Sequence, residues 1–360
     1  MPVIDVDTHW ERTDFGPGEH PLEPWLDRFP ADPVERLAFG VAGDLLRALP
    51  PDRRPDGRTL MPGLVRLAEQ RGGPVILHPL HDSSSGERVA WMDRVGIDHC
   101  IINPGGYWQM LEYLGDDRAA AVTRCNDYLG EQLSAHADRL HGVAVVDFAD
   151  LPGAAKEMAR ARERGHRAFF LYTLNGRPPG LVPPGHPDWD LVWDAAVDLG
   201  MVASIHVGNT AADFSGWADI GWDLPGGGGV TALTRLANTM RIHVAQNLLV
   251  SLLYGGVFHR HPRLTVVLEE MKIGWVPSFI DACTRQALPS AALGDWPYDV
   301  SGGDMLRRNV KVTPLPGFGD VEALDVLAQR PDMVLFSSDY PHQEGNAEPI
   351  ALYGERLGGL

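Results

Sequence analysis

The feature that most constrains the fold is the regular alternation of short apolar runs with segments of helical spacing. Eight runs rich in β-branched and aromatic residues recur along the chain, at 3–6, 99–102, 142–146, 168–172, 201–206, 264–269, 309–313 and 333–336. The gaps with helical spacing are 117–137, 151–164, 188–199, 231–254 and 321–329. Short apolar runs of this kind are typical of strands in a buried parallel sheet. The pattern therefore predicts an α/β fold, a (β/α)8 TIM barrel, with an open doubly wound sheet as the alternative.

The chain length and two irregular segments define the expected domain organisation. The 360 residues fit a single barrel domain over 1–360 that carries additions. A segment rich in Pro, Asp and Arg, at about 10–79, follows the first run, and a Gly-rich loop at about 217–229 follows the fifth. Both segments follow the carboxyl ends of predicted strands, where barrel enzymes carry their active-site loops. We therefore expect a distorted barrel in which these insertions form a lid or a wall of the substrate pocket.

Composition narrows the classes of partner. The chain has 31 basic and 48 acidic residues, for a net charge of −17, which argues against nucleic acid and anionic membranes as partners. No stretch approaches the roughly 18 uninterrupted apolar residues of a membrane span, and no secretory signal is visible. The three cysteines are too few and too scattered for a disulfide framework. We expect a cytoplasmic protein that acts on a small molecule.

The first run ends in a motif that could bind a metal ion, Asp5-Val6-Asp7-Thr8-His9. Side chains two positions apart on a strand point the same way, so Asp7 and His9 can face one ion in the barrel mouth. Carboxylate oxygen and imidazole nitrogen are normal ligands for Zn and Mn. The alternative is that an aspartate caps a turn and His9 only packs, and a lone Asp-x-His motif does not decide between them.

Further polar residues mark the carboxyl ends of three other predicted strands. His206 ends the fifth run, Glu269 and Glu270 end the sixth, and Asp339 and His342 follow the eighth. Each has a structural alternative: a core histidine, a buried ion pair, an Asx-turn or a surface histidine. Strand alternation predicts that only one of the two glutamates faces inward. Because the carboxyl ends of barrel strands surround one pocket, these residues together predict a single site.

Four motifs in this order support a family resemblance. They are Asp5-Val6-Asp7-Thr8-His9, the stretch from His186-Pro187-Asp188-Trp189 to His206-Val207-Gly208, the stretch from Gly256-Val257-Phe258 to Glu270 with Gly274-Trp275-Val276-Pro277, and Ser338-Asp339-Tyr340-Pro341-His342. Over nearly its whole length the chain resembles the amidohydrolase-related superfamily of metal-dependent barrels. The similar branch contains aminocarboxymuconate-semialdehyde decarboxylase and γ-resorcylate decarboxylase.

The resemblance implies a ligand set and a cofactor. Asp7 and His9 fall in the first two ligand positions, His206 in the strand-five position and Asp339 in the strand-eight position. It implies one divalent ion, Zn or Mn, because no lysine is placed as the bridging ligand of the binuclear members. Barrels of this family tend to dimerise, so a homodimer is also expected.

The resemblance also implies a reaction, although the sequence departs from the family pattern at Glu270, at Ile273 and at Asp7, where many members have histidine. The branch carries out decarboxylation, in which Asp339 or a water that it protonates would supply the proton, with Glu270 and His342 as further catalytic residues. However, Glu270 stands where the decarboxylases carry a catalytic histidine, and Ile273 stands where their downstream glutamate would fall. Because the resemblance covers nearly the whole chain, the first hypothesis is still a metal-dependent decarboxylase of a small carboxylated aromatic or enol-like substrate.

Two other hypotheses use the same sequence differently. In the first, the site is that of a hydrolase that attacks an amide, ester or lactone with a metal-activated water, with Asp339 accepting the proton. In the second, the barrel has lost its chemistry and acts as a scaffold, although residues suited to all four ligand positions argue against this. Product analysis separates the enzyme hypotheses, because only decarboxylation releases CO2.

Overall fold

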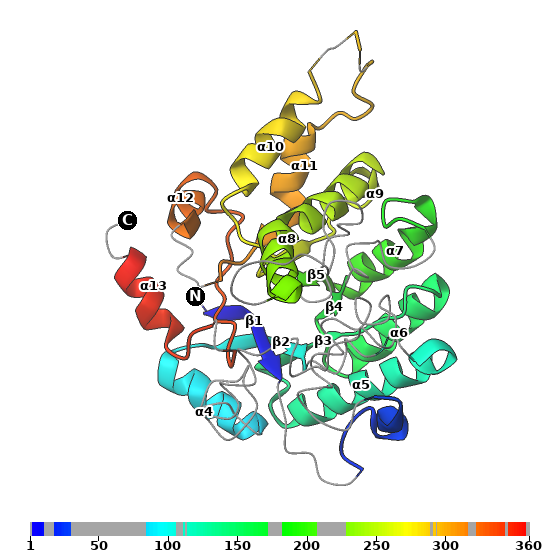
Figure 1. The fold of residues 1–360 in the computed structure, drawn as a ribbon, viewed down its shortest axis with the longest axis vertical. Helices are drawn as coiled ribbons and strands as arrows, with labels where there is room; N and C mark the ends of the chain where they lie inside the picture. Colours follow the sequence, from blue (N-terminus) through cyan, green and yellow to red (C-terminus); the bar gives the residue numbers. More distant parts are fainter. Residues whose placement is uncertain are drawn as a thin grey trace.

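The strands of the molecule form one parallel sheet at its centre. The computed structural model describes residues 2–10, 18–29, 84–105, 111, 114–171, 182–206, 228–288, 291–292, 294–315, 322–342 and 345–357. The strands are β1 (Ile4–Trp10), β2 (His99–Pro104), β3 (Leu140–Ala144), β4 (Ala168–Phe170), β5 (Val202–His206), β6 (Val266–Glu269) and β7 (Val310–Val312). They pair in sequence order from β1 to β7, and each pair is parallel. Figure 1 shows these strands surrounded by helices.

The eighth predicted strand closes the sheet without forming a regular strand. Val312 in β7 and Val334 form an isolated parallel bridge, as do Thr8 in β1 and Tyr340. The segment therefore lies between β7 and β1, and further backbone hydrogen bonds join it to both, such as Leu335 N to Val312 O at 2.9 Å and His9 N to Tyr340 O at 2.8 Å. The predicted barrel is confirmed, and the open-sheet alternative is wrong.

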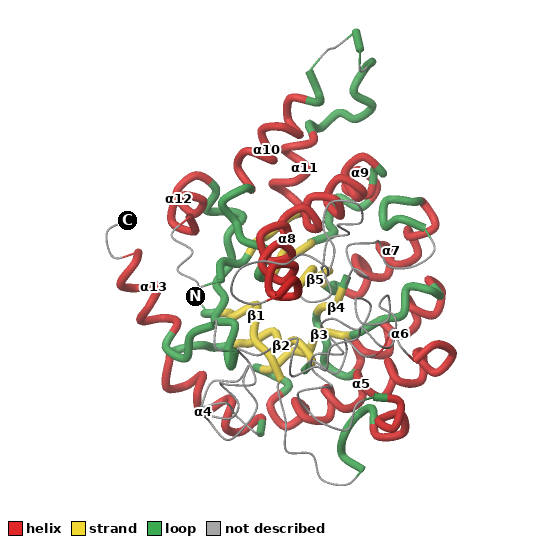
Figure 2. Tube along the Cα trace, in the orientation of Figure 1, coloured by secondary structure: helices red, strands yellow, loops and turns green. Residues whose placement is uncertain are grey.

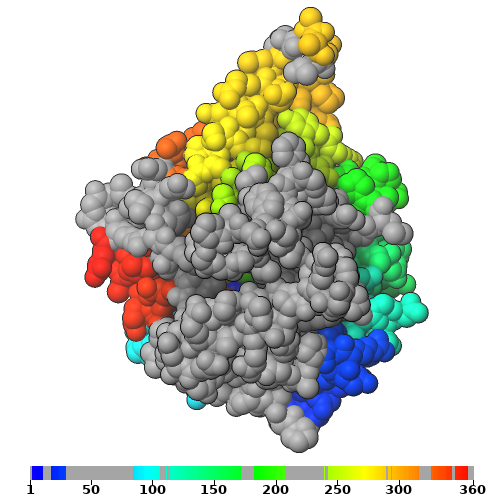
Figure 3. All heavy atoms as spheres, viewed as in Figure 1, coloured from blue at the N-terminus to red at the C-terminus, as the bar shows by residue number. Residues whose placement is uncertain are grey.

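Helices connect each strand to the next, as parallel pairing requires. The α-helices are α4 (Ser85–Val95), α5 (Arg118–Leu133), α6 (Leu151–Glu163), α7 (Asp190–Leu199), α8 (Gly228–Tyr254), α9 (Val257–Arg260), α10 (Val276–Arg285), α11 (Gly302–Asn309), α12 (Glu322–Gln329) and α13 (Pro349–Leu357). Short 3-10 helices are η1 (Glu23–Arg28), η4 (Ser134–His136) and η5 (Pro187–Trp189). Figure 2 shows the helical layer around the strands, and Figure 3 shows α10 and α11 projecting from one end of the molecule.

Two clusters of buried apolar side chains hold the helices against the barrel. The larger includes Phe169 of β4 and the stacked indoles of Trp189 and Trp193, whose centroids lie 5.4 Å apart. The smaller joins α4 and α5 to the first strands through side chains such as Trp91 and Leu129. Burial of this apolar surface is the main favourable contribution to folding. It fixes the strands whose carboxyl ends carry the polar residues described below.

Most of both insertions lies outside the described residues. Residues 11–17 and 30–79 of the first insertion and residues 217–227 of the Gly-rich loop are outside the described part, whereas residues 228 and 229 stand at the start of α8. The expected lid or wall therefore stays a prediction. Among the described helices, none is both long enough and apolar enough to cross a membrane.

Candidate metal centre

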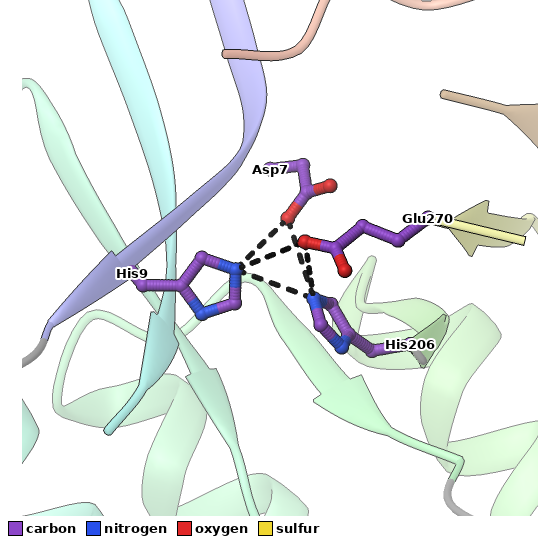
Figure 4. A group of neighbouring side chains, drawn as sticks. All are labelled: Asp7, His9, His206 and Glu270. Carbon is purple, nitrogen blue, oxygen red and sulfur yellow. Dashed lines mark hydrogen bonds and ion pairs between the residues drawn. The ribbon is translucent and has the colours of Figure 1, made fainter. Parts of the chain in front are cut away.

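Four polar side chains from three strands meet inside the barrel. Asp7 and His9 come from β1, His206 is the last residue of β5, and Glu270 directly follows β6. One ligand atom of each lies within 4.8 Å of the others, and all four residues are buried. His9 Nε2 lies 3.5 Å from Asp7 Oδ1 and 3.2 Å from His206 Nε2. Figure 4 shows the four side chains pointing toward one another, so their polar atoms can face a single ion.

The segment after β7 brings Asp339 and His342 to the same place. His9 Nε2 lies 3.3 Å from Asp339 Oδ1, and His342 Nδ1 lies 2.9 Å from the same oxygen. The imidazole of His342 stacks on that of His9, with the ring centroids 3.9 Å apart. His9, Glu270, Asp339 and His342 form a second group of neighbouring ligand atoms. Every residue predicted as a ligand or catalytic group therefore lies in one cluster, and the two groups share His9 and Glu270.

Irregular backbone geometry turns three of the carboxylates toward the centre. The pairing of β1 with β2 has a register shift between Asp5 and Thr8, which places Asp7 in a bulge. Bulges redirect side chains and are common beside active sites. Glu270 and Asp339 both adopt left-handed backbone conformations, with φ of 58° and 53°. Non-glycine residues seldom adopt this conformation, and such residues cluster at functional sites.

The left-handed conformation of Glu270 corrects one expectation about the adjacent pair Glu269 and Glu270. We expected only one of Glu269 and Glu270 to face inward, but both are buried, with exposed fractions of 2% and 3%. Alternation holds only while the backbone stays extended, and it ends at Glu270 because of its positive φ. The two carboxylates therefore lie on the same side of the structure with different partners.

A buried hydrogen-bond network supports Asp7, and sequence reasoning missed it. The Asn103 amide Nδ2 donates to Asp7 Oδ1 at 3.0 Å and to Glu269 Oε2 at 3.3 Å. The Ser204 hydroxyl also donates to Glu269 Oε2, at 2.5 Å. Asn103 stands before Pro104, directly after the apolar run at 99–102. Its polarity at the carboxyl end of an apolar run is the signal that could have identified it.

Two further buried residues attach the closing segment to β1. Asp5 Oδ1 accepts a hydrogen bond from Ser338 N at 3.0 Å, and burial raises the pKa of Asp5 to about 7. The guanidinium of Arg88 in α4 donates to Thr8 Oγ1 at 3.1 Å and lies 5.0 Å from the ring centroid of Tyr340. These contacts hold the end of β1 against the segment that carries Asp339.

The electrostatics of the centre favour positive charge. Burial opposes protonation of His9, but the neighbouring carboxylates of Asp339, Asp7 and Glu270 outweigh it and raise the pKa of His9 well above 6.5. Burial likewise opposes protonation of His206, but the charge of Glu270 prevails and raises its pKa to about 9. Burial would raise the pKa of Glu270, yet His206 and His9 hold that pKa well below its usual range. The carboxylates thus create a negative field at the point where the imidazoles meet.

Asp339 differs from Glu270 in its protonation. Burial, and then the charge of Glu270, raise the pKa of Asp339 to about 7, against the lowering effect of His342. At neutral pH, Asp339 can therefore hold or release a proton, whereas Glu270 is ionised. Neighbouring carboxyl groups with separated pKa values are typical of acid–base chemistry.

The residues of this centre fit a divalent metal ion. Within the part of the chain that the structure describes, Asp7 Oδ2, Glu270 Oε1 and Asp339 Oδ2 are buried and accept no hydrogen bond. Buried oxygens without donors are costly unless a proton or a cation satisfies them. Imidazole nitrogens and carboxylate oxygens in this number are the donors that Zn and Mn accept. The chemistry of the centre therefore suits the divalent ion that the sequence predicts.

Comparisons with known proteins agree with this architecture. A model of the amidohydrolase family matches residues 4–357. An amidohydrolase from Mycobacterium avium subsp. paratuberculosis is 21% identical, with a TM-score of 0.65 over 100% of this chain and 94% of that one. A dihydroxybenzoic acid decarboxylase from Polaromonas, solved with manganese and 2-nitroresorcinol, is 18% identical, with a TM-score of 0.60 over 98% of this chain and 90% of that one.

A third solved structure has the same fold. The 5-carboxyvanillate decarboxylase from Sphingomonas paucimobilis is 18% identical, with a TM-score of 0.59 over 98% of this chain and 92% of that one. At such low identity these structures share the barrel, whereas the family model spans almost every residue from β1 to α13. The chain belongs to the amidohydrolase family.

Proposed function

We propose that this chain is a metal-dependent decarboxylase of a small carboxylated aromatic or enol-like molecule. The observation that carries the proposal is the Asp339–His342 pair, in which a buried carboxyl group meets a partly exposed imidazole, in contact with the ligand cluster through His9. Decarboxylation needs a group that delivers one proton to the carbon that loses CO2. Decarboxylases of hydroxybenzoates among the structural neighbours lend support to this choice of reaction.

Asp7, His9 and His206 would hold the metal ion, with Asp339 or Glu270 beside them. A bound divalent ion supplies Lewis-acid polarisation of substrate oxygens. Asp7 is oriented by Asn103, and His9 is fixed between Asp339 and the stacked ring of His342. These contacts keep the donor atoms in place before substrate binds, which lowers the cost of assembling the site.

Asp339 and His342 would carry out the proton transfer. Asp339 transfers its proton to the substrate carbon as the bond to the carboxylate breaks, so the products are the protonated substrate skeleton and CO2. His342 Nδ1, bonded to Asp339 Oδ1, then returns a proton taken from water. A carboxyl group whose pKa is near 7 is well matched to this cycle at neutral pH.

A second function, hydrolysis of an amide, ester or lactone, is favoured by one observation. Glu270 is a buried, ionised carboxylate beside His206, at 3.4 Å between Oε1 and Nε2. Such a carboxylate can accept a proton from a water molecule that attacks a carbonyl carbon. The same residues could therefore serve bond hydrolysis in place of CO2 release.

Product analysis tests the two functions. Protein loaded with Mn2+ or Zn2+ is incubated with a panel of hydroxybenzoic acids and enol carboxylic acids, and with a panel of lactones, esters and amides. We expect CO2 release from a member of the first panel, with one deuterium incorporated at the vacated carbon in D2O. Hydrolysis products from the second panel, without CO2 release from the first, would instead establish the hydrolase.

A further inference from the structure

Glu270 belongs to both groups of ligand atoms in the centre. The first group is Asp7, His9, His206 and Glu270, and the second replaces Asp7 and His206 with Asp339 and His342. His9 and Glu270 are therefore within reach of an ion on either side of the cluster. We propose that Glu270 is itself a ligand of the metal ion. This inference rests on the metal dependence of the proposed function, and it adds a carboxylate to the ligand set that the family resemblance implies.

The surroundings of the Glu270 carboxylate point to a cation. Oε1 lies 3.4 Å from His206 Nε2 and 3.7 Å from His9 Nε2, and it accepts no hydrogen bond from the described residues. The two nearby nitrogens are the atoms with which these histidines face the cluster (Figure 4). An ion bound between Oε1 and these two nitrogens would give all three atoms a partner.

The neighbouring glutamate provides an internal comparison. Glu269 is equally buried and has the same side chain, but its Oε2 already accepts hydrogen bonds from Ser204 and Asn103. Glu269 shares the Asn103 donor with Asp7, whereas Glu270 presents to the cluster an oxygen that has no hydrogen-bond donor. Of the two adjacent carboxylates, Glu270 is therefore the one available to an ion.

The backbone at Glu270 supports the same assignment. Its φ of 58° is a conformation that glycine adopts freely and that L-residues seldom adopt. A glutamate held in this conformation has its carboxylate turned back toward the histidines. Strain of this kind is found where the aim of a side chain matters for function.

A carboxylate ligand at this position should influence which metal the site prefers. Carboxylate oxygens suit Mn2+, whereas imidazole nitrogens suit Zn2+ better. Replacing Glu270 with glutamine removes the charge and keeps the shape. Replacing it with histidine supplies a different donor. The two variants therefore separate loss of a ligand from a change of ligand type.

Direct metal titration tests the inference without any substrate. Wild type, Glu270→Gln and Glu270→His are stripped with chelator, and Mn2+ and Zn2+ binding is measured by calorimetry, with Mn2+ electron paramagnetic resonance as a second readout. We expect Glu270→Gln to weaken Mn2+ binding by about tenfold or more, because loss of an outer partner alone costs about 10–100-fold. Glu270→His should recover Zn2+ binding more than Mn2+ binding.

Two controls separate ligation from folding. Asp190→Asn alters a carboxylate that pairs with Arg260 and His261 outside the centre, and it should bind metal as wild type does. Urea unfolding in chelator checks that each Glu270 variant is folded. If Glu270→Gln is folded and binds both ions as tightly as wild type, the inference is overturned while the proposed function stands. If wild type itself binds neither ion, both are overturned.

Discussion

Asp339 combines a left-handed backbone with a buried carboxyl group that His342 contacts directly. The geometry leaves Oδ2 without a hydrogen-bond donor among the described residues, so this oxygen can carry the transferable proton. His342 is partly exposed, with 14% of its side-chain surface accessible, so it can exchange protons with water. At the scale of single residues, these features suit the proposed proton transfer and distinguish the pair from the more enclosed side chains of Asp7 and His9.

The first prediction concerns this pair. Asp339→Asn should lower kcat by about 10²–10⁴-fold, because it removes the proton donor and leaves the shape of the site unchanged. His342→Gln should lower kcat less, since Asp339 keeps its own proton but regains it more slowly. Steady-state kinetics at saturating Mn2+ measure both effects. Unchanged kcat in Asp339→Asn would remove this residue from the reaction.

The second prediction concerns the residue that orients Asp7. Asn103→Leu removes the hydrogen bond to Asp7 Oδ1 and should weaken metal binding by about 10–100-fold. Asn309→Leu is the matched control, because Asn309 is also buried and donates to Leu264 O, yet has no contact with the described centre. Calorimetric titration should show a weaker metal affinity only in the Asn103 variant. Equal affinities in the two variants would make Asn103 a purely structural residue.

Sequence reasoning located the candidate ligands more readily than the residues that support them. Asp7, His9, His206 and Asp339 could be found because each is a polar residue at the end of an apolar run, where barrel strands converge. The support from Asn103 could not be found in this way, because a hydrogen bond between neighbouring strands depends on their register. The sequence does not reveal register before the strands are paired.

At the scale of elements, the packing of β3 against the turn before β4 depends on a glycine. A Cβ atom at Gly142 would lie 2.6 Å from Nδ1 of His166 and 3.1 Å from Cδ2 of Leu129. His166 is fully buried, so it has no space into which it can move. The close approach explains why this strand position has no side chain.

The third prediction follows from that contact. Gly142→Ala should lower the free energy of unfolding by about 1–3 kcal/mol through overpacking. Gly354→Ala is the control, because nothing lies within 4 Å of its Cβ position and the residue is exposed within α13. There, alanine should stabilise the protein by about 0.5–1 kcal/mol, since glycine is a poor helix former. Urea denaturation measures the change in the free energy of unfolding of each variant, and the two changes should have opposite signs. A stabilising effect of Gly142→Ala would contradict the packing argument.

The elements were predictable where local signals were strong. Seven of the apolar runs became β1 to β7, and the helical gaps became α5, α6, α7, α8 and α12. The helix α4 was not predicted, although Ser84 accepts a hydrogen bond from Glu87 N as a helix cap and its sequence signature is visible. The eighth run forms only one isolated bridge, at Val334, and the side chain of Ser337 after it donates a hydrogen bond to Pro314 O. Such side-chain bonds are decided by tertiary structure and not by apolar pattern.

For the whole molecule, pH dependence of stability is expected from buried histidine. Burial disfavours the charged imidazolium and lowers the pKa of His166 from its usual 6.5. Below about pH 6.5 the unfolded chain binds a proton at this residue that the native state does not bind. The free energy of unfolding should therefore fall as the pH drops through this value, until the lowered native pKa is reached.

The fourth prediction isolates this contribution. The glutamine in His166→Gln does not titrate. The free energy of unfolding of wild type relative to this variant should therefore be lower at about pH 5 than at about pH 7.5, by up to about 1.4 kcal/mol for each unit by which the pKa of His166 is lowered. Urea unfolding in the presence of chelator measures the difference without a contribution from bound metal. A difference between wild type and variant that stays constant with pH would show that His166 is not the cause.

The contact between Asp5 and Ser338 joins residues that are 333 positions apart in the chain. A ribosome delivers β1 long before the closing segment, so the nascent barrel has two open strand edges until that segment is synthesised. Open strand edges are sites of unwanted association, which makes this interval the period when chaperone protection matters most. A fragment cut before residue 333 would also lack the Asp339–His342 pair. Under the proposed function, such a fragment should therefore be inactive.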